Sequence, residues 1–239
     1  MNQGEWLNQQ AASRGIELSG EQLDQFQRYY ELLIQKNKVM NLTAITDQHE
    51  VYVKHFFDSL TIAPSLSLNQ VERIIDVGTG AGFPGIPLKI AFPHLKLVLL
   101  DSLKKRVGFL QEVATALGLK QVECIHGRAE ELAHQAKYRQ TFDLATARAV
   151  ARLNILAEYC LPFVKVGGHF VAMKGAAVQE EVQEAKQALH ILGKASLSTV
   201  SLELPEGMGT RHLLILKKRD NSPKAYPRRA GIPAKQPIV

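Results

Sequence analysis

The sequence has few of the features that mark membrane, secreted and metal-binding proteins. None of its apolar runs approaches the roughly 20 residues that cross a bilayer, and its first residues lack the basic and then apolar order of a secretion signal. Its only cysteines, Cys124 and Cys160, form no Cys-x-x-Cys pair, so we expect neither a disulfide framework nor a structural zinc site. The eight histidines lack the His-Glu-x-x-His spacing of zinc enzymes. These absences predict a cytoplasmic protein without a bound metal.

The positive charge of the chain is concentrated at its C-terminal end. The 239 residues, 46% of them hydrophobic, are enough for one sizeable domain, and their net charge is +6. Residues 217–239 contain seven lysines or arginines and one acidic residue, so this segment alone carries that net charge. Four prolines and few large apolar residues predict a disordered tail over residues 218–239. Such a tail either contacts RNA phosphates or only improves solubility.

Hydrophobic periodicity divides the rest of the chain into a helical part and an alternating part. Residues 1–70 are predicted to form a helical extension, in which Ser19 and Gln22 make a capping box. Within residues 71–217, strand and helix patterns alternate, which predicts an α/β fold with a doubly wound, mostly parallel sheet. The predicted strands are residues 73–77, 95–100, 121–126, 142–147 and 165–173. After them we expect a helix over 176–191 and two β-rich runs, 196–203 and 212–216.

A glycine-rich turn follows the first predicted strand. Asp76 lies near the end of that strand, and three alternate glycines follow, Gly78, Gly80 and Gly82. Such glycines permit positive φ angles and let a ligand approach the backbone. A dinucleotide fingerprint, G-x-G-x-x-G, would need glycine where Phe83 stands, so the spacing favours an adenosine cofactor without a pyrophosphate. Phe83 is then expected to form an apolar wall of the site.

A second acidic residue follows the next predicted strand. Asp101 lies 19 residues after Gly82, a position from which a carboxylate can bind both ribose hydroxyls. Because ligands of a doubly wound sheet collect where the parallel strands end, Asp76 and Asp101 are expected at a common site. The alternative is that both acids only cap the helices that follow them. Together with the glycines, the pair favours cofactor binding.

Residues 76–88, with the sequence DVGTGAGFPGIPL, resemble the cofactor loop of class I S-adenosylmethionine methyltransferases. More narrowly, they resemble the bacterial small-subunit (16S) ribosomal RNA guanine-N7 methyltransferase family, RsmG, formerly glucose-inhibited division protein B. The other blocks that resemble this family are residues 41–45, 55–60, 100–106, 127–130, 142–149 and 173–175. The resemblance extends in order over about residues 15–217.

The resemblance implies a fold, a cofactor and a reaction. The implied fold is a Rossmann-like, seven-stranded sheet that ends in an antiparallel pair. The implied cofactor is S-adenosylmethionine, with Ala129 and Glu130 at its adenine end, although Glu130 fits equally well as an early helix residue beside the helix dipole. The implied reaction is methylation at N7 of one guanine in the decoding-region loop of 16S rRNA. The expected partner is that RNA or the 30S ribosomal subunit, and the expected oligomeric state is a monomer.

Two basic residues at predicted strand ends are candidates for positioning the substrate. Arg148 follows the strand 142–147, where a charge is costly to desolvate unless a ligand uses it, and the resemblance makes it a cofactor or substrate contact. Lys174 holds the equivalent place on the next strand, where the alternative is a solvated lysine. Both are assigned to contacts with O6 or phosphate, because guanine N7 has a free lone pair and needs no general base.

Other motifs narrow the chemistry only in part. The chain has no Asn-Pro-Pro-aromatic turn and no Pro-Cys nucleophile, which related enzymes use to methylate exocyclic amino groups or pyrimidine carbon. His55 and Asp58 either line the cofactor site or join the helical extension to the sheet. Residues 104–106 form a basic cluster that is either a solvated face or an RNA contact. The alternative functions are methylation of a small molecule or protein, and a cofactor-binding regulator without catalysis.

Overall fold

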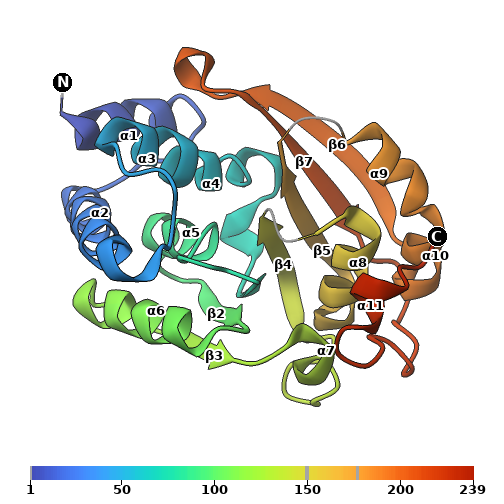
Figure 1. The fold of residues 1–239 in the computed structure, drawn as a ribbon. Coiled ribbons are helices and arrows are strands. Elements are labelled where there is room, and N and C mark those ends of the chain that lie inside the picture. Colours follow the sequence, from blue (N-terminus) through green and yellow to red (C-terminus); the bar gives the residue numbers. More distant parts are fainter. Residues whose placement is uncertain (1, 149–150, 176–177) are drawn as a thin grey trace.

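The N-terminal extension is helical, as predicted. The computed structural model describes residues 2–148, 151–175 and 178–239 (Figure 1). The extension contains α1 (Gln3–Ala12), α2 (Gly20–Met40), α3 (Gln48–Val51), the π-helix η1 (Tyr52–Phe57), α4 (Asp58–Leu60) and the 3-10 turns η2 (Ala63–Ser65) and η3 (Leu68–Gln70). α2 begins at the predicted capping box, because the Gln22 amide donates to the Ser19 hydroxyl and the Ser19 amide donates to the Gln22 side chain.

A seven-stranded sheet forms the centre of the molecule, in the order β3-β2-β1-β4-β5-β7-β6. Its strands are β1 (Arg73–Val77), β2 (Lys96–Asp101), β3 (Val122–His126), β4 (Phe142–Arg148), β5 (Val164–Lys174), β6 (Ser196–Glu203) and β7 (Thr210–Lys217). β1 to β5 pair in parallel, while β7 runs antiparallel to both β5 and β6. The predicted fold, including the antiparallel pair, is confirmed, and the strand bounds differ from the predicted ones by at most two residues.

Helices cover both faces of the sheet, and each face has its own hydrophobic core (Figure 1). They are α5 (Gly85–Ala91), α6 (Lys104–Ala116), α7 (Ala129–Leu132), α8 (Leu153–Cys160), η4 (Leu161–Phe163), α9 (Gln179–Glu184), α10 (Lys186–Gly193), η5 (Pro205–Gly207) and α11 (Ile232–Lys235). Ile74 belongs to the core shared with α2, α5 and α6, whereas Ile75 belongs to the core under α8 and α10. Neighbouring strand residues therefore enter opposite cores, which explains why these strands are apolar throughout.

The helix predicted over residues 176–191 is divided into two. α9 ends at Glu184 and α10 begins at Lys186, while residues 176 and 177 lie outside the described part of the chain. Residue 149, the last of one block that resembles the methyltransferase family, also lies outside it. None of the helices in the described residues combines the length and the apolar character that a membrane crossing requires.

The N-terminal extension packs directly on the helices of the sheet. The side-chain amide of Gln22 donates to the carbonyl of Ile90 in α5, over 2.7 Å. Tyr29 is fully buried, and its hydroxyl donates to the carbonyl of Ala81 in the glycine-rich turn. The extension therefore contacts the predicted cofactor loop.

The C-terminal residues differ from the disordered tail that the sequence predicts. Lys218 is fully buried, Ile238 is 9% exposed, and α11 forms between them. The Lys218 ammonium donates to three oxygen atoms, including the side chain of Gln140, and burial lowers its pKa to about 7. The prediction of disorder from proline content and low apolar content was wrong because Lys218 and Arg228 bind acceptors far away in the sequence, and these contacts hold the segment on the fold.

Candidate functional site

Asp76 supports the glycine-rich turn from beneath. It is fully buried in β1, and its Oδ2 accepts hydrogen bonds from the Thr79 hydroxyl (2.6 Å) and the Gly85 amide (2.9 Å). Burial raises its pKa to about 6, because the lost solvation outweighs these hydrogen bonds. Within the described residues, Asp76 is absent from the walls of the pockets around the turn. The structure thus places this predicted site residue under the loop.

Gly80 and Gly82 are glycines for different reasons. Gly82 has a φ of 106°, and a Cβ there would lie 2.5 Å from Ile86 Cδ1 and 2.6 Å from the Tyr29 hydroxyl. Gly80 has a φ of 62°, but a Cβ there would meet open space. Gly82 is therefore required by packing, whereas Gly80 leaves room in front of the backbone for a ligand.

A pocket of about 440 Å³ opens at this turn and is termed the glycine-loop pocket. It is lined by Leu42, Thr43, His55, Gly78, Thr79, Gly80, Ala81, Phe83, Asp101, Ser102, Arg106 and Arg148. Five of these, Gly78, Gly80, Phe83, Asp101 and Arg148, are site residues predicted from the sequence. Asp101 is buried at the end of β2, where its two oxygens accept from the amides of Gly80 and Leu103, each over 2.9 Å. These bonds fix the carboxylate at the pocket wall.

A smaller pocket of about 180 Å³, termed the side pocket, adjoins the first one. The two share Gly78, Asp101 and Ser102, and the other lining residues of the side pocket are Val77, Leu100, Gly127, Arg128, Ala129, Glu130 and Tyr159. Ala129 and Glu130, the residues expected at the adenine end of a cofactor, therefore lie beside the glycine-rich turn. Glu130 is 5% exposed, and its Oε1 accepts from the amide of Gly231 over 3.0 Å.

A third pocket, of about 350 Å³, lies on the other side of Arg148 and is termed the cationic pocket. Its lining residues are Ile45, Lys54, His55, Asp58, Arg148, Met173, Lys174, Gly175 and Arg211. It shares His55 and Arg148 with the glycine-loop pocket. Four of its lining residues are lysines or arginines and one is an aspartate, so the pocket suits a ligand with electronegative atoms.

Arg148 forms the partition between the two larger pockets. Its Nη1 donates to Asp58 Oδ2 (3.2 Å) and to the Lys54 carbonyl (3.1 Å), and its guanidinium carbon lies 4.8 Å from the centre of the Phe83 ring. Arg211 Nε lies 3.2 Å from the same Asp58 oxygen. Burial lowers the pKa of Arg148, while the charge of Asp58 acts in the opposite direction. Two guanidiniums are thus held around one carboxylate.

His55 lines both pockets and Asp58 lines the cationic pocket, and both also contact Arg148 of β4, which joins the helical extension to the sheet. Asp58 is 1% exposed, and its Oδ1 has no hydrogen-bond partner among the described residues. The His55 ring stacks on Phe83 with centroids 4.6 Å apart, and its Nε2 lies 2.8 Å from the Thr43 hydroxyl. Burial, together with the charge of Arg148, lowers the pKa of His55 to about 3. The imidazole is therefore neutral at physiological pH.

Lys174 lies at the end of β5 and lines the cationic pocket, but not the glycine-loop pocket. Its side chain is 10% exposed, its Nζ lies 2.7 Å from Glu181 Oε2, and it donates to the carbonyl of Ala151. The lysine is therefore not the solvated residue considered as an alternative. Of the basic cluster 104–106, only Arg106 lines the described part of the glycine-loop pocket, 3.6 Å from Asp101.

Several site residues were not found by sequence reasoning. They are Leu42, Thr43, Ile45, Lys54 and Arg211. The first three lie in the block 41–45, which marked the resemblance but carried no chemical signal. Arg211 stands near the start of β7, whereas the basic residues predicted for the site, Arg148 and Lys174, stand at strand ends.

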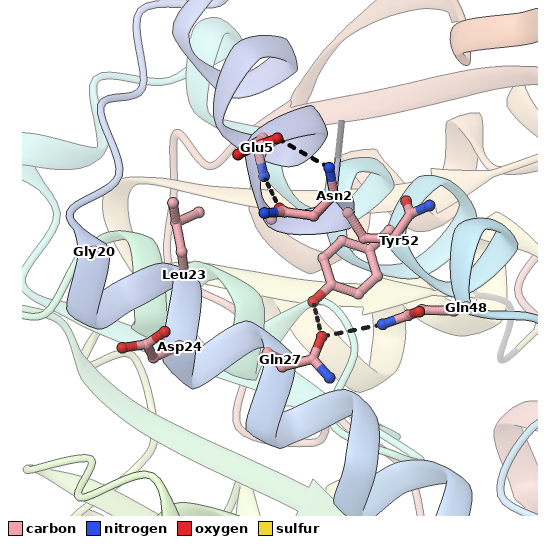
Figure 2. A pocket seen from close by; sticks show the side chains of 10 residues that line it. Asn2, Glu5, Gly20, Leu23, Asp24, Gln27, Gln48 and Tyr52 are labelled. Atoms are coloured by element: carbon pink, nitrogen blue, oxygen red, sulfur yellow. Dashed lines mark hydrogen bonds between the residues drawn. The ribbon is translucent and has the colours of Figure 1, made fainter.

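The N-terminal helices contain a larger hollow, of about 580 Å³, between α1, α2 and the region of η1 (Figure 2). Its polar side chains bond to one another: Tyr52 and Gln48 both donate to Gln27 Oε1, each over 3.1 Å. Within the described residues, none of its lining residues lies in the glycine-rich turn or among the predicted site residues. Size alone therefore does not identify the functional site.

Comparison with known proteins identifies the family of this chain. The family model described as rRNA small subunit methyltransferase G matches residues 22–214. This chain belongs to that family. A protein named ribosomal RNA small subunit methyltransferase G from Brevibacillus brevis is 52% identical over 95% of this chain and 96% of its own length. One of the same name from Exiguobacterium sp. is 52% identical over the whole of both chains.

Solved structures agree with this fold. An O-methyltransferase from Bacillus cereus in complex with SAH is similar with a TM-score of 0.57 and 16% identity, covering 80% of this chain and 91% of its own. Cofactor-bound Rv0187 from MTB is similar with a TM-score of 0.57 and 17% identity, covering 81% and 91%. At these identities the likeness concerns the fold alone. Membership of the methyltransferase G family confirms the prediction of an S-adenosylmethionine-dependent methyltransferase.

Proposed function

We propose that this chain transfers a methyl group from S-adenosylmethionine to N7 of guanine 527 in the decoding-region loop of 16S rRNA. Family membership supports the class of substrate. The observation that carries the proposal is the placement of the cationic pocket next to the glycine-loop pocket, with Arg148 and His55 lining both. A donor in one pocket and an acceptor in the other would meet at these two residues.

The glycine-loop pocket and the side pocket fit the cofactor. S-adenosylmethionine, when bound, supplies a methyl group on a positively charged sulfur. The lone pair of an acceptor can bond to the methyl carbon while the sulfur leaves as a neutral thioether. Gly80 leaves open space in front of the backbone, and the Asp101 carboxylate is oriented to accept from ribose hydroxyls. Ala129 and Glu130 would hold the adenine end, because they line the side pocket beyond Asp101. Phe83 supplies the apolar wall.

The cationic pocket fits the acceptor base. Guanine presents O6 and N7 as acceptors on one edge, and guanidinium and ammonium groups bind O6 or a neighbouring phosphate. Arg148, Lys174 and Arg211 are the groups we assign to this task. Contacts must be made to O6 and not to N7, because a donor on N7 would occupy the lone pair that reacts.

The site does not require a general base. N7 loses no proton when it is methylated, so the chain has only to align its lone pair with the methyl group, an orientation effect worth several orders of magnitude in rate. His55, with a pKa of about 3, is a poor proton acceptor. Asp58 Oδ2 bonds to Arg148 and Arg211, so this carboxylate orients both guanidiniums. We therefore assign His55 and Asp58 to positioning, since the reaction releases no proton from N7.

We further propose that the chain acts as a monomer in the cytoplasm, on naked 16S rRNA or on the 30S subunit. The test incubates purified chain and methyl-labelled S-adenosylmethionine with 16S rRNA, with 30S subunits or without RNA. The expected result is label in RNA and, after reduction, strand scission at a single guanine. Label in a small molecule or protein, or no transfer despite cofactor binding, would support the alternatives and contradict the proposal.

A further inference from the structure

The C-terminal segment, residues 219–239, lies across two helices that border the side pocket. In Figure 1 its helix α11 lies next to α8, with α7 nearby. The segment lies outside residues 22–214, which the family model matches. Neither the family model nor the sequence blocks that marked the family include the contacts of this segment.

Arg228 is bound tightly to Glu158 of α8. Its guanidinium makes three hydrogen bonds to the two carboxylate oxygens, of 2.7 to 3.2 Å, and its backbone amide makes a fourth of 2.7 Å. The Glu158 side chain is 1% exposed, whereas the Arg228 side chain is 27% exposed, so a buried carboxylate is paired with a half-buried guanidinium. Forked contacts between an arginine and a carboxylate fix direction as well as distance. The next residue of α8, Tyr159, lines the side pocket.

The same segment holds α7. The Gly231 amide donates to Glu130 Oε1 over 3.0 Å, and Glu130 is itself a lining residue of the side pocket. Five residues before the first residue of α11, the Pro227 carbonyl lies 2.8 Å from Nε2 of His134, just after α7. Beyond α11, the carbonyl of Ile238 accepts from Asn154 in α8. Both helices that line the side pocket, α7 and α8, are therefore hydrogen-bonded to the C-terminal segment.

We propose that residues 219–239 position the adenine end of the cofactor site, with Arg228 acting through Glu158 and the Gly231 amide acting through Glu130. The inference rests on the proposed function, because it assumes that the side pocket receives the adenine. α7 has only four residues and cannot be rigid by itself, so an external support sets the direction of the Glu130 carboxylate. A site that is ordered before binding loses less entropy when the ligand enters.

Arg228 and its neighbour Arg229 provide the matched test. Arg229 is exposed, whereas Arg228 is paired with Glu158. Arg228→Ala, Arg228→Lys and Arg229→Ala are compared with the wild type by calorimetry, using S-adenosylhomocysteine and adenosine as ligands. The unfolding midpoint without ligand is measured for each, and Arg228→Lys retains a cation for the buried carboxylate if Arg228→Ala folds poorly.

The expected result is that Arg228→Ala weakens both ligands by the same factor, roughly tenfold, since only their shared adenosine part is affected. Arg228→Lys should lose less affinity for the two ligands, and Arg229→Ala should bind them as the wild type does. In the methyl-transfer assay the KM for the donor should rise while kcat and the KM for RNA stay within about twofold of the wild type.

Unchanged binding of both ligands by Arg228→Ala, with normal binding by the wild type, would overturn this inference alone. A rise in the KM for RNA equal to that for the donor would also overturn it, because a general loss of structure would then explain the effect. If the wild type bound neither ligand, the proposed function itself would fail.

Discussion

The glycine-loop pocket and the cationic pocket share two residues but are built in different ways. The first centres on the backbone of one turn, with Asp76 beneath it and Gly80 open in front, and side chains from the extension, β2, α6 and β4 complete its wall. The second is formed by charged side chains from the extension, β4, β5 and β7, held around Asp58. The backbone of the turn tolerates few substitutions, but its shape is set by local contacts. The side-chain site forms only when several elements that are distant in sequence are packed next to one another.

The largest effect should come from the packed glycine. Gly82→Ala places a Cβ against Ile86 and Tyr29 at a φ of 106°, so the unfolding free energy should fall by about 3 kcal/mol. Gly80→Ala meets open space, so it should cost only about 1 kcal/mol of stability. Gly80→Ala should nevertheless weaken S-adenosylhomocysteine binding, because the alanine side chain would enter the pocket. Urea unfolding and calorimetry on both variants check this, and equal stability losses would contradict it.

Arg148→Lys tests the partition between the pockets. Lysine cannot reproduce the contacts to Asp58, the Lys54 carbonyl and the face of Phe83, so the acceptor should be misaligned. We expect kcat to fall about 100-fold. Binding of S-adenosylhomocysteine should weaken by less than about tenfold, because Asp101 and the glycine-rich turn remain. Single-turnover assays measure the effect on methyl transfer, and calorimetry measures the effect on S-adenosylhomocysteine binding. Full activity of the variant would show that Arg148 does not position the substrate.

Arg211→Gln tests the cationic pocket alone. Arg211 lines that pocket and not the described wall of the glycine-loop pocket. The KM for RNA should rise about tenfold, as for the loss of one forked contact to a base, while cofactor binding stays unchanged. Arg219→Gln is the control, since Arg219 is exposed beyond the other end of β7. If Arg211→Gln weakened cofactor binding as much as RNA binding, the two pockets would not be separate binding sites.

The smallest effect on turnover concerns pH. Since the pKa of His55 is about 3 and N7 needs no base, kcat should show no ionisation of His55 between pH 5.5 and 8.5. Stability should respond instead: unfolded His55 binds a proton below its ordinary pKa of 6.5 and the folded residue does not. Unfolding free energy should therefore fall with pH below 6.5, by up to about 1.4 kcal/mol per unit. His55→Gln should lack this component. Asp76, whose pKa is raised to about 6, acts in the opposite direction, so only the difference between the two proteins is informative.

The parts of the site that follow local patterns were predictable from sequence. Asp101 ends β2, and Gly80 and Phe83 lie in the turn that follows β1. Parallel strands end at one edge of the sheet, so the positions of these residues follow from the strand pattern. Arg148 was found by the same rule. Asp76 obeyed the rule as well, but it points beneath the loop, which the spacing alone does not reveal.

The cationic pocket was not predictable in the same way. β7 runs antiparallel to β5, with His212 opposite Lys174, so the start of β7 lies at the edge where the other strands end. Arg211 is therefore brought to the site by a reversal of direction that no local pattern encodes. The C-terminal segment escaped prediction for a related reason: its Arg228 and the preceding Lys218 are bound by Glu158 and Gln140, which are remote in sequence.

The pairing of Asp58 with Arg211 joins a residue made early in translation to one made late. While the chain grows, the glycine-rich turn and its strand neighbours can assemble before β7 exists. The carboxylate then has one guanidinium and not two. Residues 219–239, which support the adenine end, are made later still, so a nascent copy completes both the base site and the cofactor site only when its last residues are in place.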